Sequence, residues 1–115
     1  MGSQSIQIVT SAGAHDGQKI MRIKGPLSIH TIFDFQTAMR AETSPTLIVD
    51  FSEVPFIDST GLGALVGVQL TAQKSNRKLA LAGMNPQVLA LLDMTKVSQF
   101  FKAYPTIQDA ETAVS

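Results

Sequence analysis

A buried strand followed by a long amphipathic helix is the feature that most constrains the fold of this chain. The run Leu47–Phe51 is nearly continuous in apolar character, as expected for a central strand covered on both faces. A helical pattern then extends from Ser59 to Ser75, and its sheet-facing side is formed by Leu62, Leu65, Val66 and Ala72. Together these segments predict a sheet with helices packed on it.

Two segments of alternating polarity precede this unit. Residues 5–10 and 18–24 read as strands, and the Asp16-Gly17 turn between them predicts a hairpin. Gly25-Pro26 ends the second strand. Ser28 is then expected to cap a helix over residues 29–41, whose apolar residues are Ile29, Ile32, Phe33, Phe35 and Met39.

The C-terminal part predicts two more helices and two more strands. Residues 78–82 form a strand, and Asn85 followed by Pro86 is a strong helix start. A short edge strand is expected at residues 100–103, and Thr106 with Asp109 resembles the capping box of a last helix. The inward residues of these two helices are expected to be Val88, Leu91 and Leu92 in the first and Ile107, Ala110 and Val114 in the second.

The element order predicts an α/β fold in one domain over residues 1–115, with a mixed four- to five-stranded β-sheet and about four packed α-helices. Residues 1–4 are expected to be disordered or left over from cloning. The chain is 44% hydrophobic and 16% charged, and nine basic residues balance nine acidic ones. This composition argues against nucleic-acid and membrane partners. With no cysteine and no export signal or membrane-length apolar run, the expected location is cytoplasmic.

A hydroxyl flanked by an acid stands where the central strand gives way to the helix, in the run Asp58-Ser59-Thr60-Gly61. A phosphate on Ser59 would face the positive end of the helix dipole and would add about two negative charges to the surface. Two plainer interpretations remain open from the local sequence. Ser59 could be a simple helix cap, and Asp58 could be a turn residue or cap rather than a group that orients the hydroxyl or binds a partner's cation.

Glycines interrupt the outer face of the same helix. Gly63 and Gly67 share a stripe with Thr60, Thr71 and Lys74. A glycine inside a helix costs about 1 kcal/mol relative to alanine, so two of them need a reason. Close packing against a neighbouring helix of the domain and close approach of a partner's backbone explain the spacing equally well.

The segment from Val49 to Gly63, with its Asp58-Ser59-Thr60-Gly61-Leu62-Gly63 element, resembles the signature of the STAS domain family of bacterial anti-sigma factor antagonists. The resemblance extends over essentially the whole chain. Lys24-Gly25-Pro26-Leu27-Ser28 stands where the family often has G-E-L-D, and Leu91-Leu92-Asp93-Met94-Thr95 resembles its L-F-D-M-[ST] segment. Pro26 and Ser28 depart from the acidic residues of that pattern, which alters part of the expected partner surface.

The resemblance implies a binding switch and no catalytic residues. Ser59 matches the serine that a kinase-type anti-sigma factor phosphorylates and a phosphatase resets. The unphosphorylated domain binds the anti-sigma factor, so that sigma-factor-dependent transcription proceeds. The implied partner surface consists of Ser28, Asp58, Thr60, Gly61, Gly63 and Gly67. The alternative implied role is a STAS-domain scaffold or accessory subunit of a stress-sensing or lipid-transport complex.

Enzymatic and cofactor-binding functions find little support. Gly61, Gly63 and Gly67 nearly match a dinucleotide fingerprint, but they do not directly follow a strand. A triad of Ser59 and Asp58 with His15 or His30 lacks the nucleophile elbow, and both histidines are expected to be structural or surface residues. Two histidines without cysteine form no recognisable metal site. We therefore expect no cofactor and no metal.

Overall fold

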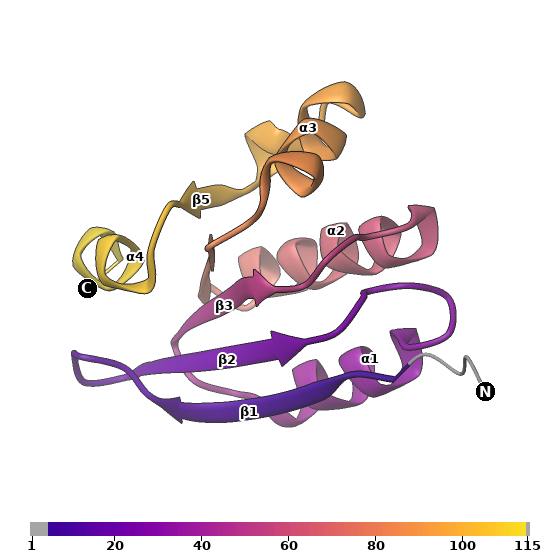
Figure 1. Ribbon diagram of the computed structural model, residues 1–115. Helices are drawn as coiled ribbons and strands as arrows, with labels where there is room; N and C mark the ends of the chain where they lie inside the picture. Colours follow the sequence, from indigo (N-terminus) through magenta and orange to yellow (C-terminus); the bar gives the residue numbers. More distant parts are fainter. Residues whose placement is uncertain (1–4, 115) are drawn as a thin grey trace.

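The computed structural model describes residues 5–114, which form one five-stranded sheet with four α-helices (Figure 1). The elements in chain order are β1 (Gln7–Ala12), β2 (Gln18–Lys24), α1 (Ile32–Ala41), β3 (Thr46–Glu53), α2 (Ser59–Lys74), β4 (Lys78–Ala82), α3 (Pro86–Met94), a 3₁₀ turn (Ser98–Phe100), β5 (Lys102–Tyr104) and α4 (Ile107–Ala113). The predicted α/β class and the predicted element order are confirmed.

The strands lie side by side in the order β1-β2-β3-β4-β5. β1 pairs antiparallel with β2, and all the other neighbours are parallel. β3 is the central strand and is buried on both faces from Thr46 to Phe51, as its continuous apolar character predicts. The carboxyl ends of β2, β3 and β4 therefore lie at one edge of the sheet.

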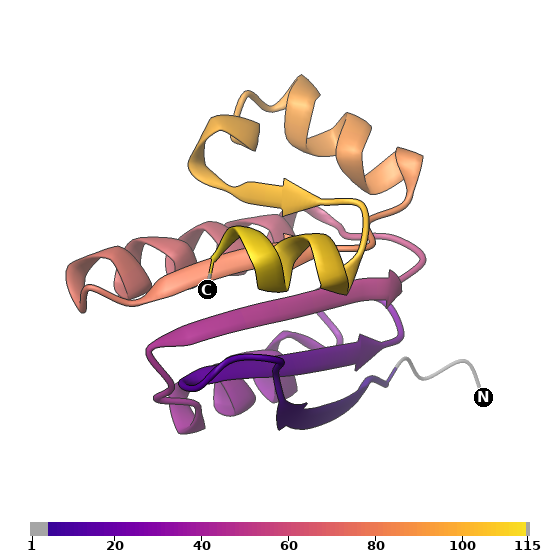
Figure 2. The same cartoon turned by 90° about the vertical axis from the view of Figure 1, so that its left-hand side faces the viewer.

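Helices cover both faces of the sheet, and each face has its own apolar core. On one face, Val49, Phe51 and Leu81 pack with Phe35 of α1, Leu65 of α2 and Val88 of α3. On the other face, Ile48 and Ala80 pack against Ala110 and Val114 of the C-terminal segment. Figure 2 shows α4 in front of the sheet, with α1 and α2 behind it.

Several local predictions match in detail. Asn85 caps α3 by accepting the Val88 amide at 2.8 Å, and Pro86 is the first helical residue. Thr106 caps α4 by accepting the Asp109 amide at 3.1 Å. The inward faces of α3 and α4 also match, since Val88, Leu92, Ala110 and Val114 are buried.

The start of α1 was predicted wrongly. The helix begins at Ile32 rather than at Ile29, and Ser28 does not cap it. Residues 28–31 form a turn instead, because Thr31 Oγ1 accepts the Ser28 amide at 3.0 Å and donates to the Pro26 carbonyl at 2.8 Å. The Ser28 hydroxyl accepts the His30 amide at 3.2 Å within this turn.

The edge strand is shifted from its predicted place. Residues 98–100 form a 3₁₀ turn, so the strand spans Lys102–Tyr104 rather than residues 100–103. Phe101 lies between the two and is buried in the core. The expectation for residues 1–4 lies outside the described residues.

Candidate functional site

The loops that follow β2 and β3 meet at the carboxyl edge of the sheet. The Leu27 amide donates to the Phe56 carbonyl and the Asp58 amide donates to the Leu27 carbonyl, both at 3.1 Å. Leu27 and Ile57 thereby form a short parallel bridge, and both are buried. This bridge holds the turn before α1 against the N-terminus of α2, and so brings segments far apart in the sequence into one site.

Asp58 is the N-cap of α2. Its Oδ1 accepts the Gly61 amide at 2.8 Å, and its Oδ2 accepts the Ile29 amide at 3.0 Å. These bonds, led by that from Gly61, hold the pKa of the Asp58 carboxyl below its ordinary value. The carboxylate therefore caps the helix and fastens the neighbouring turn to it. The sequence left open whether Asp58 is a helix cap, a turn residue or a group that acts on Ser59 or a partner, and the structure supports the helix cap.

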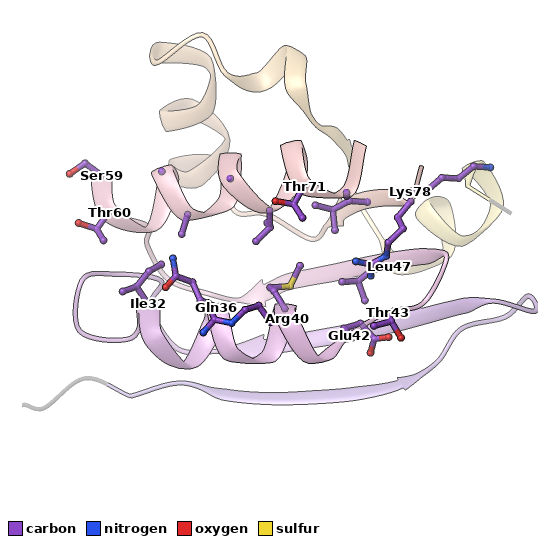
Figure 3. Close-up of a pocket in the computed structure, with 18 residues that line it drawn as sticks. Ile32, Gln36, Arg40, Glu42, Thr43, Leu47, Ser59, Thr60, Thr71 and Lys78 are labelled. Carbon is purple, nitrogen blue, oxygen red and sulfur yellow. The ribbon is translucent and has the colours of Figure 1, made fainter. Parts of the chain in front are cut away.

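Ser59 is the first residue of α2 and is exposed, whereas Thr60 is half-buried. Because Asp58 caps the helix, the interpretation of Ser59 as the N-cap is wrong. Its hydroxyl is presented at the surface, at the positive end of a helix of sixteen residues. Figure 3 shows Ser59 at the beginning of the helix, near Thr60 and Ile32.

The three glycines of α2 differ in what surrounds them. A Cβ atom on Gly61 would overlap the Leu27 carbonyl, so the bridge between the two loops requires glycine there. A Cβ atom on Gly63 or Gly67 would meet nothing within 4 Å, and both residues are exposed. Close packing inside the domain is therefore excluded as the reason for Gly63 and Gly67. The open space at both positions is compatible with the other interpretation, the close approach of a partner's backbone.

An open groove with a volume of about 810 Å³ lies between α1 and α2. It begins near Ser59 and Thr60 and extends past Gly63 and Gly67 to residues 77–79 (Figure 3). Its apolar surface comes from both helices and from the sheet beneath them, through Ile32, Met39, Leu47, Ala64, Val68 and Leu79. The missing side chains of the two glycines leave this groove open.

Exposed apolar side chains accompany the turn before α1. Ile29 is 63% exposed and Phe33 is 71% exposed, while Phe56 in the loop after β3 is 40% exposed. The amide of Ile29 is bonded to Asp58, so this residue is a close neighbour of Ser59. An apolar surface beside the exposed hydroxyl is a feature of interaction sites.

The expected site residues are only partly brought together at the surface. Asp58, Ser59 and Thr60 lie beside the groove, and Gly63 and Gly67 line it. Ser28 is 2% exposed and Gly61 is also buried, so both support the site from beneath.

Sequence reasoning missed the exposure of Ile29 and Phe33 and the groove contribution of α1. The spacing of Ile32, Phe35 and Met39 could have shown that Phe33 lies off the inner face. No sequence pattern could have predicted the groove, because it depends on how two separate helices pack.

Comparisons with known proteins agree with this architecture. A sequence profile of the STAS domain matches residues 6–110. The chain belongs to the STAS domain family. Its sheet and its helices are those of a STAS domain.

The curated relatives include an anti-sigma factor antagonist and a protein named only for its STAS domain. The chain is 28% identical over 105 residues to the anti-sigma F factor antagonist of Paenibacillus polymyxa, covering 88% of this chain and 87% of the relative. It is 29% identical over 97 residues to a STAS-domain containing protein of Pseudomonas aeruginosa, covering 82% of this chain and 96% of the relative.

Solved structures show the same fold. An anti-sigma factor antagonist from Mycobacterium paratuberculosis matches with a TM-score of 0.81 at 26% identity, covering 95% of this chain and 93% of that one. The phosphorylated form of the Bacillus cell fate determinant SpoIIAA matches with a TM-score of 0.68 at 18% identity, covering 95% and 100%. In this chain, no helix within residues 5–114 is long and apolar enough to cross a membrane.

Proposed function

We propose that this chain is an anti-sigma factor antagonist controlled by phosphorylation of Ser59. When unphosphorylated, it binds an anti-sigma factor that is also a serine kinase, and phosphorylation releases it. A serine phosphatase restores the binding form. The chain itself contributes no catalytic group, since the kinase supplies the machinery of phosphoryl transfer and this domain only has to present a hydroxyl.

The observation that carries the proposal is that Asp58, and not Ser59, caps α2. Asp58 caps α2 with both carboxylate oxygens engaged, so the exposed Ser59 hydroxyl is not needed for the fold. A phosphate on Ser59 would stand beside the ionised Asp58 carboxylate, which holds the exposed apolar residue Ile29 by its amide. An apolar partner surface would then have to desolvate two adjacent anions, which is costly.

The names of the curated relatives give the proposal its partner class. Two of them, from Paenibacillus polymyxa and Staphylococcus epidermidis, are antagonists of anti-sigma factors, and an anti-sigma factor is therefore the proposed partner here. The proposed contact surface is Asp58, Ser59, Thr60, Gly63 and Gly67, with Ser28 and Gly61 in support. The proposed location is the cytoplasm, where sigma factors act.

The test is a binding experiment with a kinase-type anti-sigma factor from the same organism. Unmodified chain and S59A should bind it in the presence of ADP, and S59D should not. Retained binding by S59D would contradict the phosphorylation switch. A chain that binds no anti-sigma factor, but copurifies with transporter or stress-sensing subunits, would favour the scaffold role instead.

A further inference from the structure

The groove between α1 and α2 has dimensions that suit a small, linear ligand. Its volume of about 810 Å³ lies within the range of small-molecule sites, about 300–1,000 Å³. It follows α2, whose sixteen residues span about 24 Å at 1.5 Å per residue. The groove is therefore long, and it lies between two helices that also contact each other.

The walls of the groove favour an alkyl chain over a peptide. The apolar contribution comes from side chains such as Met39, Leu47 and Val68. The backbone amides in both helix interiors are bonded within their own helices, so an extended peptide would find few partners for its own amides.

Basic side chains lie where the two helices end. Arg40 in the last turn of α1 lines the groove, as does Arg77 after α2. Within residues 5–114 the ion pairs are Arg22–Asp50 and Lys24–Glu53, so neither of these two groove cations is paired. The Arg77 Nε is bonded to the Ser44 carbonyl at 2.8 Å, which fixes that side chain at the groove.

Glu42 is the acidic residue that lines this end of the groove, and its single negative charge is outnumbered by the two basic side chains. The Glu42 carboxylate is bonded by Ser44 through its amide at 3.0 Å and its hydroxyl at 2.6 Å. The groove thus combines an apolar interior with an excess of positive charge at one end.

We infer that this groove is a binding site for a linear apolar chain that ends in a carboxylate, such as a fatty acid. The alkyl chain lies over the space left by Gly63 and Gly67, and the carboxylate lies toward Arg40 and Arg77. The site itself does not depend on the proposed function. One consequence of this binding does rest on the proposed function. Because the groove reaches Ser59 and Thr60, its occupant would compete there with the proposed protein partner.

The direct test is calorimetric titration of the full chain with dodecanoate below its micellar concentration. We expect one-to-one binding that G67L weakens at least tenfold, because nothing surrounds a Cβ at Gly67 and the new side chain would fill the groove. The matched control is L70S on the same helix, which should bind unchanged since Leu70 does not line the groove. Binding that is absent, or that G67L leaves unchanged, would overturn the inference.

A second comparison tests the carboxylate. Replacing the exposed Arg40 by glutamine should weaken dodecanoate binding about threefold to tenfold and leave dodecanol binding unchanged. Equal effects on both ligands would refute the role of the basic end. Amide shifts of Gly63, Gly67 and Val68 on adding dodecanoate to the unmodified chain locate the ligand independently of the variants. Shifts confined to other residues would contradict the site.

Failure of this inference is distinguishable from failure of the proposed function. Dodecanoate titrations need no anti-sigma factor, and S59A should bind dodecanoate as the unmodified chain does. A chain that binds dodecanoate but no anti-sigma factor would support the groove and contradict the antagonist role.

Discussion

The Asp58 carboxylate accepts the backbone amide of Ile29 at 3.0 Å, across a separation of 29 residues. Its second oxygen accepts the Gly61 amide at 2.8 Å and caps α2. One side chain therefore sets both the start of a helix and the position of the turn before α1. The backbone of Ile29 is thereby held at Asp58, the residue directly before Ser59.

Replacing Asp58 by alanine should lower the free energy of unfolding by about 1–2 kcal/mol, because the helix loses its cap and the Ile29 amide loses its acceptor. The control is S59A, which should change it by less than about 0.5 kcal/mol, since that hydroxyl is exposed. Urea denaturation of the three proteins measures both effects. Equal losses in D58A and S59A would show that Asp58 is not the principal cap.

The stabilisation from Asp58 should depend on pH. Its folded pKa lies below the ordinary value of 3.8, so the ionised form favours the folded state. The contribution is complete above about pH 5 and disappears as the pH falls through the lowered folded pKa. The Glu42 pKa is lowered as well, mainly by the Ser44 hydroxyl, but both proteins share that effect when D58N is compared with the unmodified chain. A stability difference that grows toward low pH would contradict the assignment.

The glycines of α2 should respond to alanine in opposite directions. G63A and G67A should each raise the free energy of unfolding by about 0.5–1 kcal/mol, because their Cβ atoms enter open space and alanine favours the helix. G61A should lower it by about 1–3 kcal/mol, because its Cβ overlaps the Leu27 carbonyl. Thermal or chemical denaturation would show the signs. Destabilisation by G63A would mean that this position packs inside the domain.

The apolar residue beside Ser59 should contribute to partner binding rather than to stability. Ile29 is 63% exposed, so I29S should leave the free energy of unfolding within about 0.5 kcal/mol. Its affinity for the anti-sigma factor should fall about tenfold, the loss typical of an apolar contact at an interface. Met94, at the end of α3 and 80% exposed, is the control, and M94S should bind as the unmodified chain does. Equal affinities of I29S and M94S would remove Ile29 from the contact.

Local sequence signals predicted those parts of the fold that local interactions determine. Asn85 with Pro86 gives the start of α3 because the cap and the proline act within one turn. The start of α1 could not be found this way. Ser28 and Thr31 can both cap a helix there, and the outcome depends on the Thr31 bond to Pro26 and on the distant Asp58 carboxylate.

The candidate site shows the same limit. Asp58 and Ser59 are adjacent and both can cap a helix, and the Ile29 amide that also bonds Asp58 comes from another part of the chain. The sequence alone could not decide why Gly63 and Gly67 are glycines. Only the placement of α1 shows that nothing fills the space above them. The family resemblance indicated Ser59 where local chemistry alone favoured a simple cap.

Incubation of the chain with its kinase-type anti-sigma factor and ATP, followed by mass mapping of the modified residue, tests the central claim most directly. Our account predicts one phosphate on Ser59, loss of the complex, and no modification of S59A, while the phosphorylated chain remains folded. Phosphate on Thr60, on another residue, or on none would contradict the account.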